Sequence, residues 1–275
     1  MEPKTIFITG TSSGLGKLTA IHFARLGWNV AATMRSPEKE TELQAYDNIR
    51  LFKLDVTDPD QVRSAVAQAI ETFGKIDVVV NNAGIGVYGA LELATEEQID
   101  WQFAVNTRGP INVIRGFLPH FRANGGGMFV NISSFMGVTT AVPLGSLYNM
   151  SKFALEGLTE GLYYELKPLN IELRLIEQGG SAGNNFVNNT SWTANDEITA
   201  YDDLAGKVRA MMSNAAADPG RLDDPQIIVD AIEDAATGRS TRFRTLVGQA
   251  GQELMGLRSS VPIEQYLETV AQSYR

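Results

Sequence analysis

Short apolar runs rich in β-branched residues alternate along the chain with longer segments whose apolar residues recur at helical spacing. Such runs are typical of buried strands, and the longer segments are typical of helices with one apolar face. The predicted strands cover residues 5–9, 28–34, 49–54, 76–80, 128–132, 171–176 and 243–247. The predicted helices cover the segment that ends at Gly27, residues 37–46, 59–73, 95–122 (with a break near 106–110) and 146–167, and a segment that begins at Asp224. This alternation predicts an α/β fold, a Rossmann-like doubly wound parallel sheet with helices on both faces.

The regular alternation stops near residue 178. Residues 179–220 are rich in Asn, Ala, Gly and Ser, with one helical stretch over 201–212. A long irregular excursion from a regular domain is usually a binding loop, so we predict a substrate lid over 179–220. Residues 250–275 are predicted to form a C-terminal helical extension. Because no repeat or linker divides the sequence, we predict a single domain over residues 1–275.

A glycine-rich turn joins the first predicted strand to the first predicted helix. Gly10 allows the tight turn, Gly14 lets backbone approach a ligand, and Gly16 lets the helix pack against the strand. The helix then begins with free N–H groups and the positive end of its dipole, which favour a pyrophosphate. A turn that only needs positive φ would give the same letters, but the place between strand and helix favours nucleotide binding. The predicted contacts are Gly10, Ser12, Ser13, Gly14, Leu15 and Gly16.

Composition excludes several other kinds of site and partner. The 275 residues include no cysteine, which excludes disulfides, thiolate zinc sites and a Cys nucleophile. A net charge of −9 argues against nucleic acid as the main partner. No apolar stretch is long enough to span a bilayer and no signal peptide is visible, so we expect a cytoplasmic protein. His22 and His120 are expected to pack or cap helices, and we predict no metal site.

The strongest chemical signal is the pair Tyr148 and Lys152. Residues four apart on a helix share a face, so the phenol and the ammonium can point into one cavity. A free tyrosine has a pKa of about 10, and a neighbouring lysine cation would lower it toward the range useful for acid–base work. A surface Tyr and Lys would give the same spacing. The glycine turn upstream, and a strand that ends in Ser133 and Ser134, favour the catalytic interpretation.

Taken together, these motifs resemble the ordered motif set of the short-chain dehydrogenase/reductase family. The matching segments are residues 9–16, 81–84, 106, 131–134 and 148–152. The resemblance implies that Tyr148 is the general acid/base and that Ser134, rather than Ser133, hydrogen-bonds the substrate oxygen. It also implies that Lys152 holds the nicotinamide ribose and lowers the Tyr148 pKa, and that Asn106 anchors a water leading to Lys152. Further cofactor contacts are implied for Asn82, Ala83, Gly84, Tyr148, Lys152 and Gly179.

The second predicted strand bears on the choice between NADP(H) and NAD(H). NAD-binding units place an acidic residue about 20 residues past the glycines. Here the strand ends in Met34 and Arg35 with no acid, and Arg35 would pair with a 2′-phosphate. Ser12 could add a hydroxyl, although Arg35 could also be a solvated loop cation. We therefore predict NADP(H) over NAD(H). Asp55 and Val56 lie where the family contacts adenine, although Asp55 could simply end a strand.

The sequence departs from the family after the sixth predicted strand. Relatives often have Pro-Gly there and a Thr a few residues later, which pack on the nicotinamide. This chain has Gln178 and Gly179 with no Thr in place, and Ser181 or Asn184 could substitute. Nicotinamide placement is therefore less securely predicted than the catalytic set.

The resulting prediction is an NADP(H)-dependent oxidoreductase that interconverts an alcohol and a ketone or aldehyde, with carbonyl reduction favoured. The resemblance extends to hydroxysteroid and retinol dehydrogenases and to carbonyl reductases, and implies a homodimer or homotetramer. Val87, Tyr88, Phe186 and Trp192 predict a largely apolar substrate pocket. The alternatives are an isomerase or dehydratase that uses the same Tyr and Lys, and an NADP(H)-binding regulatory sensor without turnover.

Overall fold

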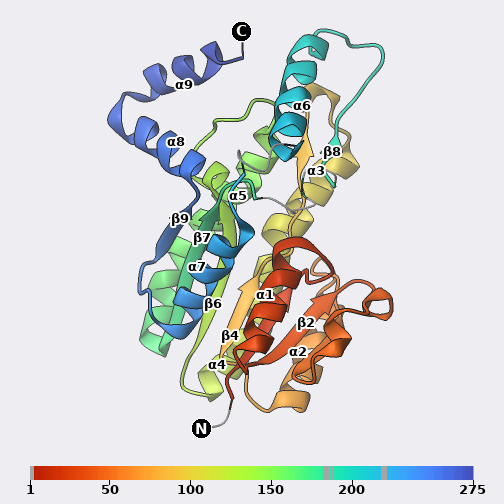
Figure 1. The fold of residues 1–275 in the computed structure, drawn as a ribbon, viewed down its shortest axis with the longest axis vertical. Helices are drawn as coiled ribbons and strands as arrows, with labels where there is room; N and C mark the ends of the chain where they lie inside the picture. Colours follow the sequence, from red (N-terminus) through yellow and green to blue (C-terminus); the bar gives the residue numbers. More distant parts are fainter. Residues whose placement is uncertain (1–2, 182–185, 187–188, 218–221, 275) are drawn as a thin grey trace.

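The computed structural model describes residues 3–181, 186, 189–217 and 222–274, and its central element is a parallel sheet (Figure 1). The strand order is β3-β2-β1-β4-β6-β7-β9, and all neighbouring strands are parallel. The order reverses direction between β1 and β4, which is where ligands bind in open sheets of this kind. The strands are β1 (Thr5–Thr9), β2 (Asn29–Met34), β3 (Ile49–Lys53), β4 (Val78–Asn81), β6 (Gly127–Ser134), β7 (Ile171–Gln178) and β9 (Arg244–Val247).

Helices cover both faces of the sheet, which confirms the predicted doubly wound Rossmann-like architecture (Figure 1). One face packs against α1 (Gly14–Arg25) and α7 (Pro225–Thr237). The other face packs against α2 (Pro59–Phe73), α4 (Gly109–Ala123) and α5 (Ser146–Leu166). Asp58 caps α2 as predicted, because its side chain accepts hydrogen bonds from the backbone N–H groups of Asp60 and Gln61.

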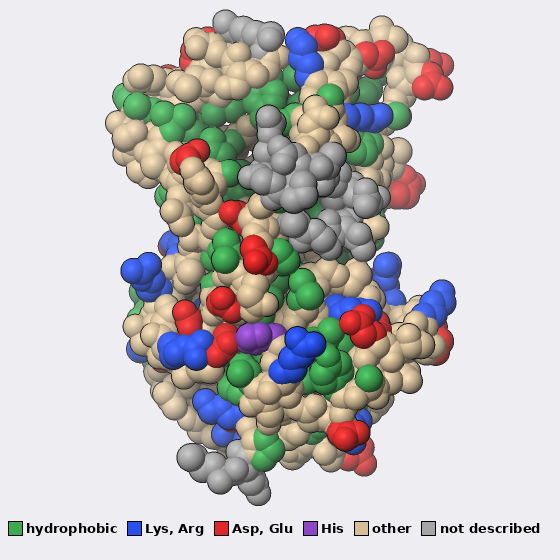
Figure 2. Space-filling model, viewed as in Figure 1, with side chains coloured by type: hydrophobic (Ala, Val, Ile, Leu, Met, Phe, Trp, Pro, Cys, Tyr) green, Lys and Arg blue, Asp and Glu red, His purple; other side chains and the backbone are tan. Residues whose placement is uncertain are grey.

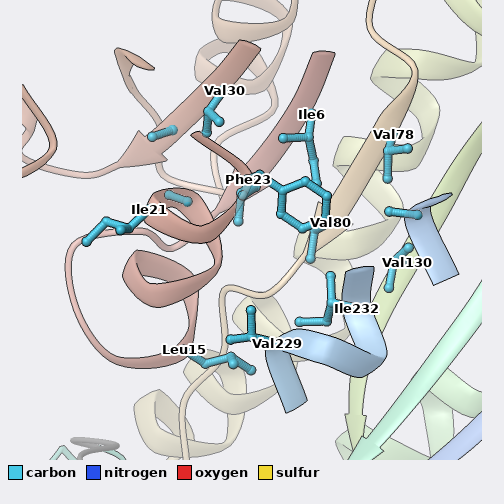
Figure 3. Close-up of a cluster of buried hydrophobic side chains, with 14 of the residues drawn as sticks. Ile6, Leu15, Ile21, Phe23, Val30, Val78, Val80, Val130, Val229 and Ile232 are labelled. Atoms are coloured by element: carbon cyan, nitrogen blue, oxygen red, sulfur yellow. The ribbon is translucent and has the colours of Figure 1, made fainter. Parts of the chain in front are cut away.

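Alternation along the strands divides the core into two layers. Ile6 and Ile8 of β1 pack toward α1 and α7, whereas Phe7 between them packs toward the opposite helices. Figure 3 shows the first layer, in which Phe23 of α1 and Ile232 of α7 lie against strand residues such as Val80. These strands are apolar on both sides because helices cover both faces of the parallel sheet.

The predicted helix over residues 37–46 is wrong. The segment forms two short 3₁₀ turns, Pro37–Lys39 and Leu43–Ala45. Between them the buried Glu40 carboxylate accepts hydrogen bonds from the backbone N–H groups of Glu42 at 2.8 Å and Leu43 at 3.1 Å. Its other oxygen lies 2.8 Å from the Lys17 ammonium. These hydrogen bonds from the backbone to the Glu40 side chain take the place of the backbone hydrogen bonds that a helix would form.

The predicted break in the long helix near residues 106–110 is confirmed. The helix α3 (Glu96–Phe103) passes into α4 through one turn of π-helix, Ala104–Arg108. Single π-helical turns are frequent at functional sites. The predicted C-terminal helical extension consists of α8 (Gln249–Ser260) and α9 (Ile263–Gln272), which Pro262 separates.

The region of the predicted lid contains α6 (Asp202–Ala217), close to the helical stretch predicted there. It also contains β8 (Ser191–Trp192), which pairs in parallel with β5 (Val87–Tyr88). The sequence analysis predicted neither of these two-residue strands. Asn184, one possible substitute for the missing threonine, lies outside the described residues. Across the described part of the chain, no helix combines the length and apolar character needed to cross a membrane.

Candidate active site

The glycine turn has the predicted geometry. Gly10 has a φ of +72° and Gly14 a φ of +55°, a backbone region that favours glycine. A Cβ on Gly16 would lie 2.3 Å from the Gly10 carbonyl oxygen, so only glycine lets α1 pack this closely on the turn. Ser13 precedes the helix without a side-chain cap, which leaves the first N–H groups of α1 available to an anion.

The end of β4 is bound to the same turn. The Thr9 hydroxyl accepts hydrogen bonds from the backbone N–H groups of Asn82 and Ala83, each at 3.0 Å. The Asn82 amide donates in return to the carbonyl oxygens of Thr9 at 2.9 Å and Gly10 at 3.1 Å. These bonds fix the turn between β1 and α1 at the point where the strand order reverses.

A cavity of about 530 Å³ lies at the carboxyl ends of the strands. It extends from the glycine turn past Arg35 and Asp55 to Tyr148 and Lys152. The predicted cofactor residues that line it are Gly10, Ser12, Ser13, Gly14, Leu15, Gly16, Arg35, Asp55, Val56, Asn82, Ala83, Gly84, Tyr148 and Lys152. Lining residues that sequence reasoning missed include Met34, Leu54, Thr57, Ile85, Trp101, Val105 and Ile132. Apart from Thr57, their mainly apolar side chains carried no chemical signal that would have distinguished them from core residues.

Gly179 is not among the residues that line this cavity. Strand β7 continues to Gln178, two residues beyond its predicted end, and the Gly179 N–H then donates to the Val247 carbonyl at 3.1 Å. Gln178 itself lines the cavity, and its buried Oε1 has no hydrogen-bond partner among the described residues. The residue that replaces the family's proline therefore offers a buried acceptor to a ligand.

Helix α5 carries Tyr148 and Lys152 into the cavity on one face. Their side chains are almost fully buried, and the Lys152 ammonium lies 5.8 Å from the centroid of the Tyr148 ring. Lys152 Nζ donates to the Ile132 carbonyl oxygen at 2.9 Å, which directs it toward the end of β6. The predicted juxtaposition of phenol and ammonium is therefore present.

Lys152 is expected to lower the pKa of Tyr148, but in the structure this pKa is raised. Burial raises the pKa of the Tyr148 phenol to about 12, and a hydrogen bond from Ser134 opposes this effect only in part. Burial also lowers the pKa of the Lys152 ammonium to about 8, although the negative charge of Glu156 opposes it. Burial is therefore the dominant cause of the pKa shift of both groups.

Ser134, and not Ser133, faces Tyr148. The Ser134 hydroxyl lies close enough to Tyr148 to lower its pKa, and its oxygen accepts the Met136 N–H at 3.1 Å. The adjacent Ser133 points to the other side of the strand, because successive side chains alternate. Its hydroxyl is buried near Glu156 and has no partner among the described residues.

Asn106 lies in the π-helical turn and is almost fully buried. Its Oδ1 accepts the Ile85 N–H at 2.9 Å, and its Nδ2 donates to the Ile85 carbonyl at 2.9 Å and to the Ser151 hydroxyl at 3.1 Å. A Cβ on Gly84 would lie 3.6 Å from Asn106 Oδ1 and 3.8 Å from Lys152 Nζ. Asn106 and Lys152 thus flank one point beside Gly84.

Aromatic side chains form a wall beside Tyr148. The Tyr148 ring stacks on Tyr88 with 5.7 Å between centroids and meets the edge of Phe186 at 5.3 Å. Trp192 lies 5.9 Å from Tyr88, because the β5–β8 pairing places the two residues in register. Val87 is buried next to Tyr88. The structure therefore brings together Tyr88, Phe186 and Trp192 beside Tyr148, whereas Val87 lies outside this cluster.

The two histidines lie away from this cavity. His120 Nε2 accepts the Ile76 N–H at 3.0 Å. His22 Nε2 lies 2.5 Å from a Glu233 oxygen, and with Asp230 these groups could in principle surround a cation. The Arg239 guanidinium, 2.6 Å from Glu233, already provides a positive charge there. We assign no metal to this cluster.

Fold and site together define a nucleotide-binding α/β protein with a Ser, Tyr and Lys constellation at the end of its cavity. Comparison with known proteins agrees: residues 4–194 match the family model described as short chain dehydrogenase. The chain therefore belongs to the short-chain dehydrogenase family of oxidoreductases.

Individual relatives extend the similarity to nearly the whole chain. The chain is 35% identical over 264 residues to a 3-ketodihydrosphingosine reductase of Bacteroides thetaiotaomicron, which covers 94% of this chain and 93% of that protein. A crystal structure of a short-chain dehydrogenase from Streptomyces avermitilis has a TM-score of 0.83 and 30% identity, with 100% and 99% of the two chains covered. A metagenomic short-chain oxidoreductase crystallised with NADP has a TM-score of 0.68 and 26% identity, with 89% and 96% covered.

Proposed function

We propose that the protein is an NADP(H)-dependent oxidoreductase that reduces a ketone or aldehyde to an alcohol, or catalyses the reverse reaction. The observation that carries this proposal is the placement of Tyr148 and Lys152 in the same cavity as the glycine turn. In this proposal the nicotinamide supplies the hydride, and the protein supplies orientation, a proton and electrostatic stabilisation.

The cavity fits a dinucleotide in three respects. The glycine turn packs closely against neighbouring backbone, at positions where any Cβ would collide. The N-terminus of α1 has no side-chain cap. Gln178 Oε1 is a buried acceptor without a partner among the described residues. The pyrophosphate would lie on the N-terminus of α1. The exposed Arg35 would pair with the 2′-phosphate of NADP(H), since no acidic side chain ends β2 to repel it.

Each catalytic side chain has a role that its geometry supports. Tyr148 would donate its proton to the carbonyl oxygen during reduction, and Ser134, which lies beside Tyr148, would donate to the same oxygen. Lys152 would hold the nicotinamide ribose, and its positive charge would stabilise Tyr148 as it loses the proton. Asn106 would hold the water that passes a proton toward Lys152.

The substrate side of the site favours an apolar molecule. Tyr88, Phe186 and Trp192 lie around Tyr148, and Figure 2 shows further hydrophobic side chains gathered in the upper part of the molecule, over the C-terminal helices. A relative with 35% identity is a 3-ketodihydrosphingosine reductase, so we propose ketones with long aliphatic chains as the first substrates to test. We further propose that residues 179–220 act as the substrate lid of a single domain, and that Gly179 or Ser181 contributes to cofactor placement.

The test is the oxidation of NADPH, followed by absorbance, over aldehydes, quinones and ketones of increasing chain length. Tyr148→Phe should lower kcat/KM by about 10²–10⁴-fold, because it removes the proton donor. Tyr88→Phe is the matched control, since it removes a buried phenol oxygen whose partner is Met136 Sδ at 3.3 Å. Turnover that persists in Tyr148→Phe would contradict the proposed mechanism.

The same assay separates the alternatives. Substrate that changes while NADPH absorbance stays constant would favour an isomerase or dehydratase, and tight NADPH binding without turnover would favour a regulatory sensor. A homodimer or homotetramer and a cytoplasmic location remain predictions. Light scattering on the purified protein tests the first of these.

A further inference from the structure

A cluster of buried charged side chains lies behind the catalytic residues. Tyr148, Lys152 and Glu156 follow one another at intervals of four along α5, so they share one face of the helix. Their exposed fractions are 7%, 6% and 4%. The proposed mechanism uses the first two residues but gives Glu156 no role.

Arg244 connects Glu156 to the sheet. Its Nε donates to Glu156 Oε2 at 2.9 Å and lies 3.1 Å from Glu177 Oε1. A second guanidinium nitrogen donates to Glu160 Oε1 at 2.9 Å, at the exposed end of the cluster. Arg244 belongs to β9 and Glu177 to β7, so one guanidinium joins α5 to two strands.

The cluster also borders the strand that carries Ser134. Glu177 pairs in register with Ser133, the residue immediately before Ser134. A Cβ on Gly137 would lie 2.7 Å from Ser133 Oγ and 3.3 Å from Glu156 Oε1, so the absence of a side chain at Gly137 leaves room for both. The Glu156 side chain therefore lies between its own helix α5, which also carries Tyr148, and the strand β6, which carries Ser134.

Burial of these charges is unfavourable for stability alone. Ser133 Oγ, Glu156 Oε1 and Glu177 Oε1 are buried and have no hydrogen-bond partner among the described residues. Two buried carboxylates and the exposed Glu160 share one partly buried arginine, and buried ion pairs seldom repay the loss of hydration. Because burial of these charges is unfavourable for folding, their presence beside an active site points to an electrostatic role.

Lys152 lies one helical turn before Glu156 on the same buried face of α5. Burial lowers the pKa of Lys152 to about 8, and the charge of Glu156 acts in the opposite direction. Burial and the charge of Glu156 also raise the pKa of Glu177 to about 7, whereas Arg244 lowers it. The charged and titratable groups around Glu156 are thus Lys152 and Glu160 on its own helix, Glu177 on β7 and Arg244 on β9.

We propose that Glu156 is a positioning residue of the active site. Its carboxylate keeps the Lys152 side chain protonated, and its hydrogen bond with Arg244 holds α5 against β7 and β9. This inference rests on the roles proposed above for Tyr148 and Lys152.

The first experiment measures the titration of Lys152 directly. Lysine labelled with ¹³C at Cε gives a resonance that moves with protonation, and the Lys152 signal is assigned by its loss in Lys152→Met. In Glu156→Gln the Lys152 pKa should fall by about one unit, because a neighbouring opposite charge is removed. Glu160→Gln is the matched control: it alters the same arginine from the exposed end and should leave the Lys152 titration in place.

The second experiment measures kcat/KM for NADPH-dependent reduction against pH. If Lys152 must be charged, a fall in its pKa from about 8 to about 7 lowers activity at pH 8 roughly fivefold and leaves activity at pH 6 nearly unchanged. Glu156→Asp retains the charge and should keep the parent's pH profile. It also keeps the proposal testable if Glu156→Gln does not fold.

Two results would overturn the inference. One is a Lys152 titration that does not change in Glu156→Gln, with activity reduced equally at every pH, which would indicate a purely structural role. The other is a Glu156→Asp profile that moves to lower pH although the charge is present. Absence of any carbonyl turnover in the parent protein would instead contradict the proposed function. The lysine titration distinguishes that failure, because it needs neither cofactor nor substrate.

Discussion

Replacement of Gly16 by alanine tests the most specific geometric feature of the nucleotide-binding turn. A Cβ at this position would lie 2.3 Å from the Gly10 carbonyl oxygen and 2.5 Å from Asn82 Nδ2. The first of these atoms belongs to the backbone of the turn and cannot rotate away. The added methyl group must therefore push the N-terminus of α1 away from the turn by about 1 Å, since ordinary contacts begin at about 3.4 Å.

The structure gives the size of the effect. The displacement breaks or stretches the bonds from Asn82 Nδ2 to the carbonyl oxygens of Thr9 and Gly10, which are 2.9 and 3.1 Å long. Each such bond contributes about 1 kcal/mol, and overpacking costs about 1–3 kcal/mol. A net loss of about 3 kcal/mol lowers the melting temperature of a chain of this size by about 6–9 °C.

The assay is thermal unfolding followed by circular dichroism, together with NADPH binding followed by fluorescence. Gly161→Ala is the control, because a Cβ at Gly161 in α5 meets no atom within 4 Å and should stabilise the helix by about 0.5–1 kcal/mol. Gly16→Ala should also weaken NADPH binding, since the helix end moves away from the pyrophosphate. A melting temperature of Gly16→Ala within about 2 °C of the parent, with NADPH affinity unchanged, would refute the reasoning.

Two further substitutions test charges of the site. Arg35→Ala should weaken NADPH binding by about 10–100-fold and leave NADH binding nearly unchanged, because a charge-assisted hydrogen bond contributes about 1.5–3 kcal/mol; equal losses for both nucleotides, measured by fluorescence titration, would contradict the NADP(H) assignment. Glu177→Gln tests the pKa of about 7 at Glu177, a value raised by burial and by Glu156. Because the pKa is raised in the folded state, ionisation of Glu177 destabilises the parent as the pH rises from about 4.5 through 7. The variant cannot ionise at this position. Its free energy of unfolding, relative to that of the parent, should therefore be about 1–2 kcal/mol higher at pH 8 than at pH 5. Denaturant unfolding at the two pH values measures this difference, and an equal effect at both would exclude a buried titrating carboxyl.

The fold could be predicted from the sequence wherever one physical signal dominated. The buried strands are short apolar runs, and Asp58 with Pro59 marks the start of α2, so both kinds of element were predicted close to their observed bounds. The prediction of a helix over residues 37–46 failed because the structure of this segment depends on the distant Lys17, which binds the Glu40 side chain. The strands β5 and β8 are two residues long, and they form only because residues 87–88 and 191–192 meet in space. No local pattern contains that information.

Much of the candidate site could be predicted for a related reason. Glycines, Tyr148 and Lys152 carry chemistry in their residue types, and parallel strands bring their carboxyl ends to one edge of the sheet. The extension of β7 to Gln178 could not be predicted, because it depends on pairing with β6 and β9. Nor could the cluster of Glu156, Glu177 and Arg244, whose members lie on three elements and look like ordinary surface charges in the sequence.

The pKa of Tyr148 bears on the direction of the proposed reaction. Burial raises it to about 12, so the phenol holds its proton at neutral pH, although it is then a weaker acid than a free tyrosine. An acid is what carbonyl reduction requires, whereas alcohol oxidation requires a base. The oxidative direction would need the Lys152 charge to lower the pKa of Tyr148, and Lys152 itself has a pKa of about 8 that the Glu156 charge helps to maintain. If these roles hold, Glu156→Gln should impair alcohol oxidation at alkaline pH more than it impairs carbonyl reduction at neutral pH, because Lys152 loses its charge only as the pH rises through its pKa.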